Sequence, residues 1–173
     1  MKFYSGFSLK NDEYFFESFI NTSNYTACGF SYGAIKAFEY VKEQLACAKR
    51  VDTLQLFSPA FFQSKSGSFK KLQLRAFGKN PTNYLDTFIS SCFFPHAKMD
   101  VKRVDGSLGE LEELLYYEWS IPQLQEICDK GVKIEVYLGG EDKIIDAQSA
   151  KKFFKEVATV IYIKNANHFL RIN

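Results

Sequence analysis

The chain has 173 residues, enough for one domain with a sizeable hydrophobic core. Hydrophobic residues make up 46% of it and charged residues 24%, as in ordinary globular proteins, and the net charge of +2 provides no global field that would attract nucleic acid. No apolar run is long enough to span a bilayer, and the N-terminus lacks the long apolar segment of a signal peptide. We therefore expect a single domain over residues 1–173 that binds neither nucleic acid nor membrane.

The cysteines and histidines argue against a metal site. Four cysteines are widely spaced without a Cys-x-x-Cys pair, which is typical of reduced core thiols in a cytoplasmic protein. The two histidines, His96 and His168, are too few for a His-rich site. We expect a cytoplasmic protein that needs no metal and no cofactor.

Strand-like and helix-like segments alternate along the chain. The first part predicts a strand at Met1–Tyr4, a helix at Glu13–Ile20 capped by Asn11 or Asp12, a strand at Tyr25–Phe30, a helix at Tyr32–Ala48 and a strand at Val51–Phe57. The middle, about 61–130, has no clear strand and predicts helices at Ser68–Phe77, Thr82–Cys92, Glu110–Trp119 and Pro122–Cys128. The last part predicts a strand at Val132–Leu138, a helix at Ala147–Val157 capped by Asp146 and a strand at Thr159–Ile163.

This alternation predicts an α/β protein with a mainly parallel sheet covered on both faces. The helical middle would be an insertion of about residues 61–130 between two strands.

One motif stands at the centre of this pattern. Gly29-Phe30-Ser31-Tyr32-Gly33 reads Gly-x-Ser-x-Gly, with a strand-like run before it and a helix-like run after it. A serine on such a sharp turn projects its hydroxyl above the sheet edge, at the positive end of the following helix. Side chains at either glycine would crowd the turn.

Two further residues fall at the carboxyl ends of predicted strands, where open parallel sheets place their sites. Asp142 follows the strand at 132–138, and His168 follows the strand at 159–163. A serine hydroxyl needs a base to become a nucleophile, a histidine can supply it, and a carboxylate orients that histidine. We predict Ser31, Asp142 and His168 as a catalytic triad.

Other residues compete for these roles. Glu141 and Asp146 are alternatives to Asp142, but Asp146 is better explained as a helix cap. His96 is an alternative base, although it lies beside Pro95 in the insertion. Cys28 is an alternative nucleophile, but its place inside a strand favours a core residue.

The three motifs together resemble the α/β-hydrolase superfamily. The elbow motif at Ser31, the segment Gly139-Gly140-Glu141-Asp142 and the segment Asn167-His168-Phe169 are similar to its nucleophile, acid and histidine loops. The resemblance implies an α/β-hydrolase fold with a shortened, mainly parallel sheet and a helical cap (lid) insertion. Tyr4-Ser5-Gly6-Phe7 would match the oxyanion turn, so that the backbone N–H groups of Phe7 and Tyr32 would form the oxyanion hole.

The chain departs from the superfamily pattern in two ways. It begins at what would be the third strand of the family. Ser5 and Asn167 replace the usual His of the oxyanion turn and Gly of the histidine loop, and we expect Asn167 to be tolerated because asparagine accepts a left-handed φ.

More narrowly, the chain looks like the very small esterases that cleave the methyl ester of pimelyl-[acyl-carrier protein] in biotin synthesis. This resemblance is carried by the shortened N-terminus, the elbow sequence Cys28–Gly33 and the Phe-rich helical insertion. It implies a serine carboxylester hydrolase that releases methanol, with the acyl-carrier protein as its partner.

The insertion has the charge that such a partner requires. Between Phe61 and Arg103 eight basic residues stand against two acidic ones, and an acidic carrier would be steered toward them. A solvated helical face explains the same cluster equally well. The candidate carrier-binding residues are Lys65, Lys70, Lys71, Arg75 and Lys79.

Two other functions remain open at this point. The same triad would serve a thioesterase or a general acyl esterase. The altered oxyanion turn and truncated N-terminus would also suit a catalytically silent binding protein with a hydrolase fold.

Overall fold

A five-stranded parallel sheet forms the centre of the protein, which the computed structural model describes over all residues 1–173. The strands follow the order β1-β3-β4-β6-β7, so each strand lies beside the next one along the chain that belongs to this sheet. Their bounds are β1 (Lys2–Tyr4), β3 (Thr26–Phe30), β4 (Thr53–Phe57), β6 (Lys133–Gly139) and β7 (Thr159–Ile163). Five parallel strands confirm the predicted α/β class and mainly parallel sheet.

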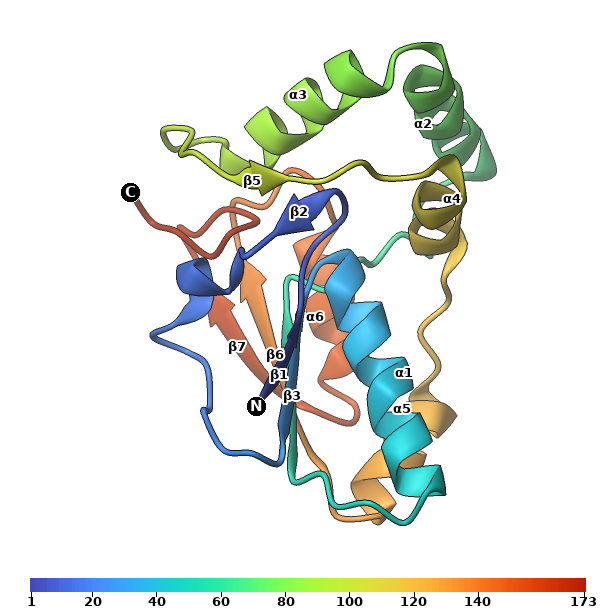
Figure 1. Cartoon of the computed structure of the whole chain (residues 1–173), viewed down its shortest axis with the longest axis vertical. Helices are drawn as coiled ribbons and strands as arrows, with labels where there is room; N and C mark the ends of the chain where they lie inside the picture. Colours follow the sequence, from blue (N-terminus) through green and yellow to red (C-terminus); the bar gives the residue numbers. More distant parts are fainter.

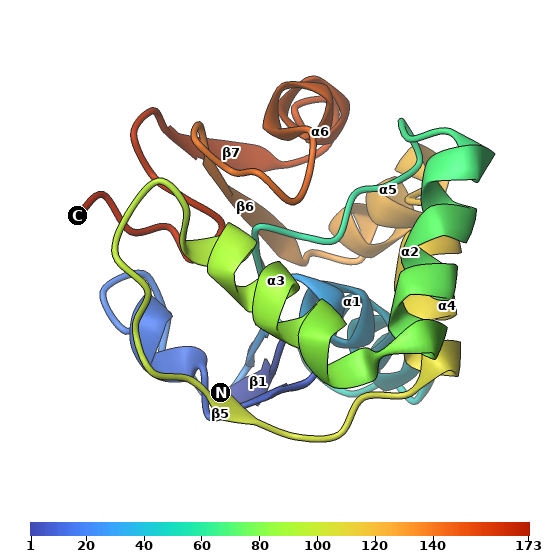
Figure 2. The same ribbon diagram turned by 90° about the horizontal axis from the view of Figure 1, so that it is seen from above.

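The helices that pack on this sheet all lie on one face. These are α1 (Tyr32–Ala46), α5 (Ile121–Asp129) and α6 (Ala147–Phe154), whose buried side chains share one core cluster with Leu54, Leu56 and Val136 (Figure 2). The sheet is covered on both faces, as predicted, but α-helices lie on only one of them. Right-handed crossovers place helices on both faces only where the strand order reverses direction, and here it never reverses.

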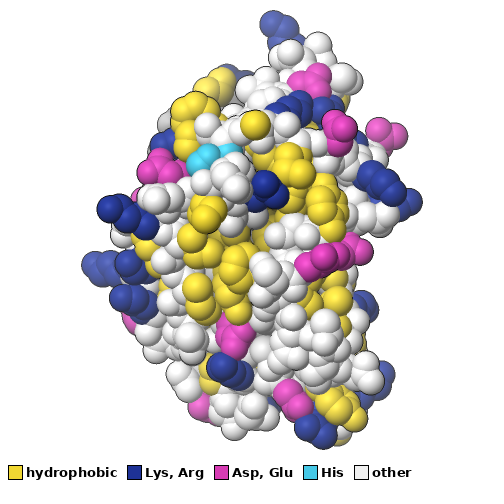
Figure 3. All heavy atoms as spheres, turned by 90° about the vertical axis from the view of Figure 1, so that its left-hand side faces the viewer, with side chains coloured by type: hydrophobic (Ala, Val, Ile, Leu, Met, Phe, Trp, Pro, Cys, Tyr) yellow, Lys and Arg dark blue, Asp and Glu magenta, His cyan; other side chains and the backbone are white.

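The opposite face is covered by segments without an α-helix. The predicted helix Glu13–Ile20 is only a 3₁₀ turn, η1 (Glu13–Phe16), and the chain then continues across the sheet in irregular conformation. Buried Gln55 holds this crossing, since its side chain donates to Phe19 O at 2.9 Å and accepts from Asn21 N at 2.8 Å. Hydrophobic side chains run down the middle of the side shown in Figure 3, with most Lys and Arg side chains toward its borders.

A cap of three helices lies over the carboxyl ends of the strands (Figure 1). It contains α2 (Gly67–Lys79), α3 (Pro81–Phe93) and α4 (Leu108–Tyr116), each within a few residues of its predicted range. The sequence did not predict β5 (Lys102–Arg103), a two-residue strand that pairs antiparallel with β2 (Leu9–Lys10). The fourth helix of the 61–130 segment, α5, contacts α1 and belongs to the sheet layer.

The cap is joined to the sheet layer by a polar contact. On α4, Glu113 accepts hydrogen bonds from the Tyr32 hydroxyl and from Lys36 Nζ, the latter at 2.7 Å. Tyr32 and Lys36 are one turn apart on α1, so both can reach the same carboxylate. This contact fixes α4 beside the start of α1.

The turn between β3 and α1 is made possible by close backbone contacts. A Cβ on Gly29 would lie 2.1 Å from Gly33 O, and a Cβ on Gly33 would lie 2.0 Å from Tyr4 O. No side chain fits at either place, which supplies the physical reason for both glycines of the elbow motif. The second contact also brings the end of β1 against the first turn of α1.

None of the helices combines the length and the apolar composition that crossing a membrane requires.

Gly33→Ala should destabilise the protein by at least about 2 kcal/mol, because a backbone oxygen cannot move aside for the new methyl group. Gly78→Ala is the matched control, since nothing lies within 4 Å of its Cβ position in α2. For this control, the higher helix propensity of alanine should raise the free energy of unfolding by up to about 1 kcal/mol. Urea unfolding of both variants tests this, and equal stability of Gly33→Ala and the wild type would contradict the close contact.

Asp146→Ala should lower the free energy of unfolding by about 1 kcal/mol, the usual contribution of a helix N-cap. Asp146→Asn should keep most of this contribution. The Asp146 carboxylate accepts from Ser149 N at 3.0 Å and from the Ser149 hydroxyl at 2.7 Å. The bond from the Ser149 backbone lowers the pKa of Asp146 below its usual value. The ionic part of the stabilisation is therefore present above the unfolded pKa and is lost as the pH falls through the folded pKa. Thermal unfolding between pH 7 and pH 3 measures it, and a difference between wild type and Asp146→Asn that stays constant over this range would contradict it.

Candidate active site

Ser31 lies between β3 and α1 in a conformation that ordinary residues avoid. Its φ of 53° and ψ of −114° turn the chain sharply, and the residue is only 5% exposed. Its N–H donates to Phe57 O at 2.9 Å, and its carbonyl accepts from the N–H groups of Ala34 and Ala60, each at 3.1 Å. The neighbouring strand and helix therefore hold the strained backbone in place.

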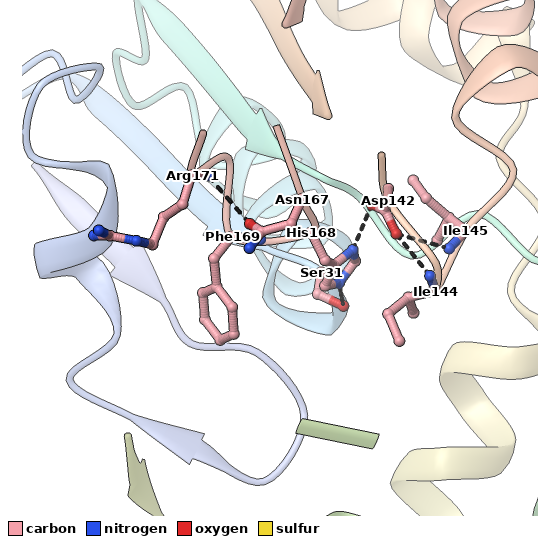
Figure 4. Close-up of polar contacts among 8 residues, drawn as sticks. All are labelled: Ser31, Asp142, Ile144, Ile145, Asn167, His168, Phe169 and Arg171. Atoms are coloured by element: carbon pink, nitrogen blue, oxygen red, sulfur yellow. Dashed lines mark hydrogen bonds and ion pairs between the residues drawn. The ribbon is translucent and has the colours of Figure 1, made fainter. Parts of the chain in front are cut away.

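The structure brings Ser31, His168 and Asp142 together (Figure 4). Ser31 Oγ lies 3.0 Å from His168 Nε2, and His168 Nδ1 lies 2.6 Å from Asp142 Oδ2. The side chains of His168 and Asp142 are fully shielded from solvent. In the tautomer that donates Nδ1–H to the carboxylate, Nε2 is free to accept the serine proton.

Backbone N–H groups orient the carboxylate of Asp142. Its Oδ1 accepts from Ile144 N at 2.7 Å and from Ile145 N at 3.1 Å, which leaves Oδ2 for the histidine (Figure 4). The two alternative acids are engaged elsewhere. Glu141 is partly exposed and lies 3.7 Å from Lys143 Nζ, and Asp146 caps α6.

The two backbone groups expected to hold an oxyanion are free to do so. The N–H of Phe7 donates to no group of the chain, and the N–H of Tyr32 is the first of helix α1, which has no acceptor within the helix. The N–H of Gly6, between β1 and Phe7, is taken by Asp12 Oδ2 at 2.9 Å. Asp12 is almost completely buried, and burial raises its pKa.

Sequence reasoning treated Asp12 as a possible helix cap, which is incorrect, since its side chain caps no helix. It instead holds the turn that carries Phe7. The signal in the sequence was an aspartate six residues after Gly6, but the sequence does not show which backbone N–H this carboxylate binds.

Asn167 is a second residue whose role the sequence did not reveal. We expected a left-handed backbone there, but Asn167 is not among the residues with positive φ. Its fully buried side chain instead donates to Phe93 O at 2.7 Å and accepts from Phe169 N at 3.0 Å and Arg171 N at 3.1 Å. Asn167 thus ties the loop of His168 to the last residue of cap helix α3.

The remaining alternatives lie outside the hydrogen-bonded group. Cys28 is buried in β3, where burial raises the pKa of its thiol to about 12. Such a thiol is inert at neutral pH. His96 Nε2 lies 3.0 Å from Asn165 O and makes a second link between the cap and the histidine loop.

A cavity of about 530 Å³ lies beneath the cap, and its lining includes neighbours of the hydrogen-bonded group but not Ser31, Asp142 or His168 themselves. Eleven of its sixteen lining residues are hydrophobic, and Phe7 and Ile144 connect it to the oxyanion turn and to the loop of Asp142. Helices α2, α3 and α4 all contribute to its walls. A cavity of this size and composition suits an apolar chain rather than a compact polar molecule.

The predicted basic residues do not form one surface. Lys71, Arg75 and Lys79 are exposed, recur every four residues along α2, and form no ion pair. Lys70 is only 7% exposed and points its ammonium at the ring of Tyr116, 5.0 Å from its centre. Lys65 is partly buried before the start of α2. The exposed basic surface therefore comprises Lys71, Arg75 and Lys79, and we call it the α2 basic stripe.

Comparison with known proteins shows which fold the chain shares. Neither a family model nor a curated protein sequence matches the chain. Among solved structures, an esterase from Exiguobacterium antarcticum superposes with a TM-score of 0.62 at 16% identity, over 82% of this chain and 58% of that one. Naproxen esterase from Bacillus subtilis gives 0.52 at 19% identity, over 85% and 54%. BioG from Haemophilus influenzae gives 0.58 at 10% identity, over 97% and 87%.

These similarities describe the architecture. The chain spans little more than half the length of the two esterases but most of the length of BioG. With a parallel sheet, a serine at the strand–helix turn and a cap over the strand ends, the chain has the α/β-hydrolase fold.

Proposed function

We propose that the protein is a serine carboxylester hydrolase that cleaves the methyl ester of pimelyl-[acyl-carrier protein], giving pimelyl-[acyl-carrier protein] and methanol in biotin biosynthesis. The observation that carries the hydrolase chemistry is the buried hydrogen-bonded series Ser31, His168 and Asp142. The choice of substrate is supported by the apolar cavity, the α2 basic stripe and the resemblance described for the sequence.

The reaction follows from the geometry of these groups. Ser31 Oγ attacks the ester carbonyl while His168 Nε2 takes its proton, and Asp142 stabilises the imidazolium that forms. The backbone N–H groups of Phe7 and Tyr32 hold the oxygen anion of the tetrahedral intermediate. His168 then gives the proton to the departing methoxide, and methanol leaves. Water, activated by the same histidine, hydrolyses the acyl-enzyme and regenerates Ser31.

The cavity is suited to bind an extended acyl chain. Its walls of Phe, Leu and Tyr side chains favour methylene groups, because each CH₂ taken out of water contributes about 0.8 kcal/mol. A linear acyl chain beneath the cap would place its terminal ester at Ser31. Its other end, attached to the carrier, would leave past the cap.

Ser31→Ala should lower methyl ester hydrolysis by at least about 10³-fold, because the reaction loses its nucleophile. The measurement is methanol release from methyl esters of differing chain length, free and carrier-bound, with the corresponding thioesters in parallel. Ser18→Ala is the matched control, since Ser18 is exposed just after η1, does not line the cavity and should keep full activity.

Each outcome has a distinct meaning. Undiminished turnover in Ser31→Ala would end the triad assignment. Preferential thioester cleavage would favour a thioesterase over the methyl esterase. Folded wild-type protein that neither hydrolyses any ester nor reacts with a fluorophosphonate at Ser31 would indicate a silent binding protein.

The α2 basic stripe should affect the hydrolysis of carrier-bound substrate only. Charge reversal of Lys71, Arg75 and Lys79 to Glu should raise KM for the carrier-bound ester roughly tenfold or more and leave a short free ester unchanged, because the charges steer the acidic carrier. The difference should shrink at 0.5 M salt as the charges are screened. A matched control reverses exposed Lys49, Lys152 and Lys155, which lie away from the cap. An equal effect of the two triple variants would reject the stripe as a docking surface.

A further inference from the structure

One residue of the cavity wall is out of place in an apolar pocket. Of the sixteen residues that line the cavity beneath the cap, Lys143 alone carries a charge. It directly follows Asp142, and Ile144, the next residue, both lines the cavity and donates its N–H to Asp142. The loop that positions the acid therefore also places an ammonium group at the cavity.

Lys143 also borders a second, polar hollow. This hollow has a volume of about 470 Å³ and shares Lys143, Thr87 and Ser91 with the apolar cavity. Its other lining residues, Asp86, Ser90 and Phe94, come from α3 or directly follow it. Lys143 thus stands where an apolar chain would pass from the cavity into polar surroundings.

The charges around Lys143 leave it available to a ligand. The one acid in the polar hollow, Asp86, is paired with Arg103 at 2.6 Å. The nearest carboxylate to Lys143 is Glu141, at 3.7 Å, with both side chains nearly half exposed. An exposed pair at this distance contributes little, so an anionic ligand can replace Glu141. The ring of Phe94 has its centre 5.8 Å from Lys143 Nζ.

We propose that Lys143 binds an anionic group of the substrate, a carboxylate or a phosphodiester, at the outer end of the acyl chain that fills the cavity. Lys143 is then a specificity-determining residue, which selects acyl esters that carry a negative charge beyond the apolar segment. This inference rests on the proposed function for the identity of the reacting group. In a free half-ester the anion is the second carboxylate of the acyl chain, and in a carrier-bound substrate it is the phosphodiester of the prosthetic arm.

The test uses pairs of substrates that differ in one anionic group. The first pair is the monomethyl and the dimethyl ester of each straight-chain dicarboxylic acid from six to ten carbons. The second pair is a monomethyl acyl thioester of phosphopantetheine and the same thioester of pantetheine. Lys143→Ala should lower kcat/KM about tenfold for the charged member of a pair, through KM, and leave the neutral member unchanged.

Variants of graded charge complete the series. Lys143→Arg should keep the preference for the charged member, and Lys143→Glu should reverse it. Lys98→Ala is the matched control, because Lys98 is exposed beyond α3 and lines neither hollow. A selective loss in the first pair identifies a carboxylate as the ligand, and a selective loss in the second identifies the phosphate group of the prosthetic arm. An equal loss on charged and neutral substrates, or no loss in either pair, would overturn the proposal.

A binding measurement separates this proposal from the hydrolase function. In the Ser31→Ala background, with or without Lys143→Ala, displacement of an apolar fluorescent dye is titrated with a straight-chain fatty acid and with its methyl ester. We expect Lys143→Ala to weaken the acid about tenfold and the methyl ester not at all. This result would support the anion site even if wild-type protein hydrolysed no ester, whereas equal affinities for both ligands in both backgrounds would reject the site even in an active esterase.

Discussion

The close approach of backbone to backbone around Ser31 is the constraint on which the site depends. Gly29 and Gly33 leave no room for a side chain, and Ser31 between them has a positive φ. This geometry directs the hydroxyl out of the sheet toward His168, and it presses the end of β1 against the start of α1. The Ser31 hydroxyl and the N–H of Tyr32 are therefore positioned by the same few contacts.

The fold class and the positions of Ser31, Asp142 and His168 could be predicted because the sequence patterns that indicate them are local. A strand, a Gly-x-Ser-x-Gly turn and a helix occupy the twenty-one consecutive residues Thr26–Ala46, and Asp142 and His168 each follow a β-prone run. What the sequence could not supply were contacts between distant segments. The link from Asn167 to Phe93 spans 74 positions and leaves no periodic pattern. Lys70 looked like its neighbour Lys71, but only the packing of α2 against α4 decides which of the two is buried.

The order of the strands in space was also not predictable from the sequence. Alternating strands and helices are compatible with helices on one face or on both, and the order of the strands in space decides between them. Here the order runs one way through β1, β3, β4, β6 and β7. The connection from β1 to β3 crosses the other face, so that it has the opposite hand to those through α1, α5 and α6. Its irregular course, held by Gln55, explains why a helix predicted from apolar content reduces to η1.

The same side chains cover that second face and position His168. Phe169, directly after His168, packs in the core of this face, with its ring 4.8 Å from Phe30 and 4.4 Å from Phe93. Phe30 precedes Ser31, and Phe93 ends α3 of the cap, where it also accepts the bond from Asn167. The aromatic cluster thus joins the nucleophile turn, the histidine loop and the cap where no helix covers the sheet. The larger core cluster on the helical face contains none of these three rings, so a loss of packing among them would act first on the spacing between His168 and Ser31.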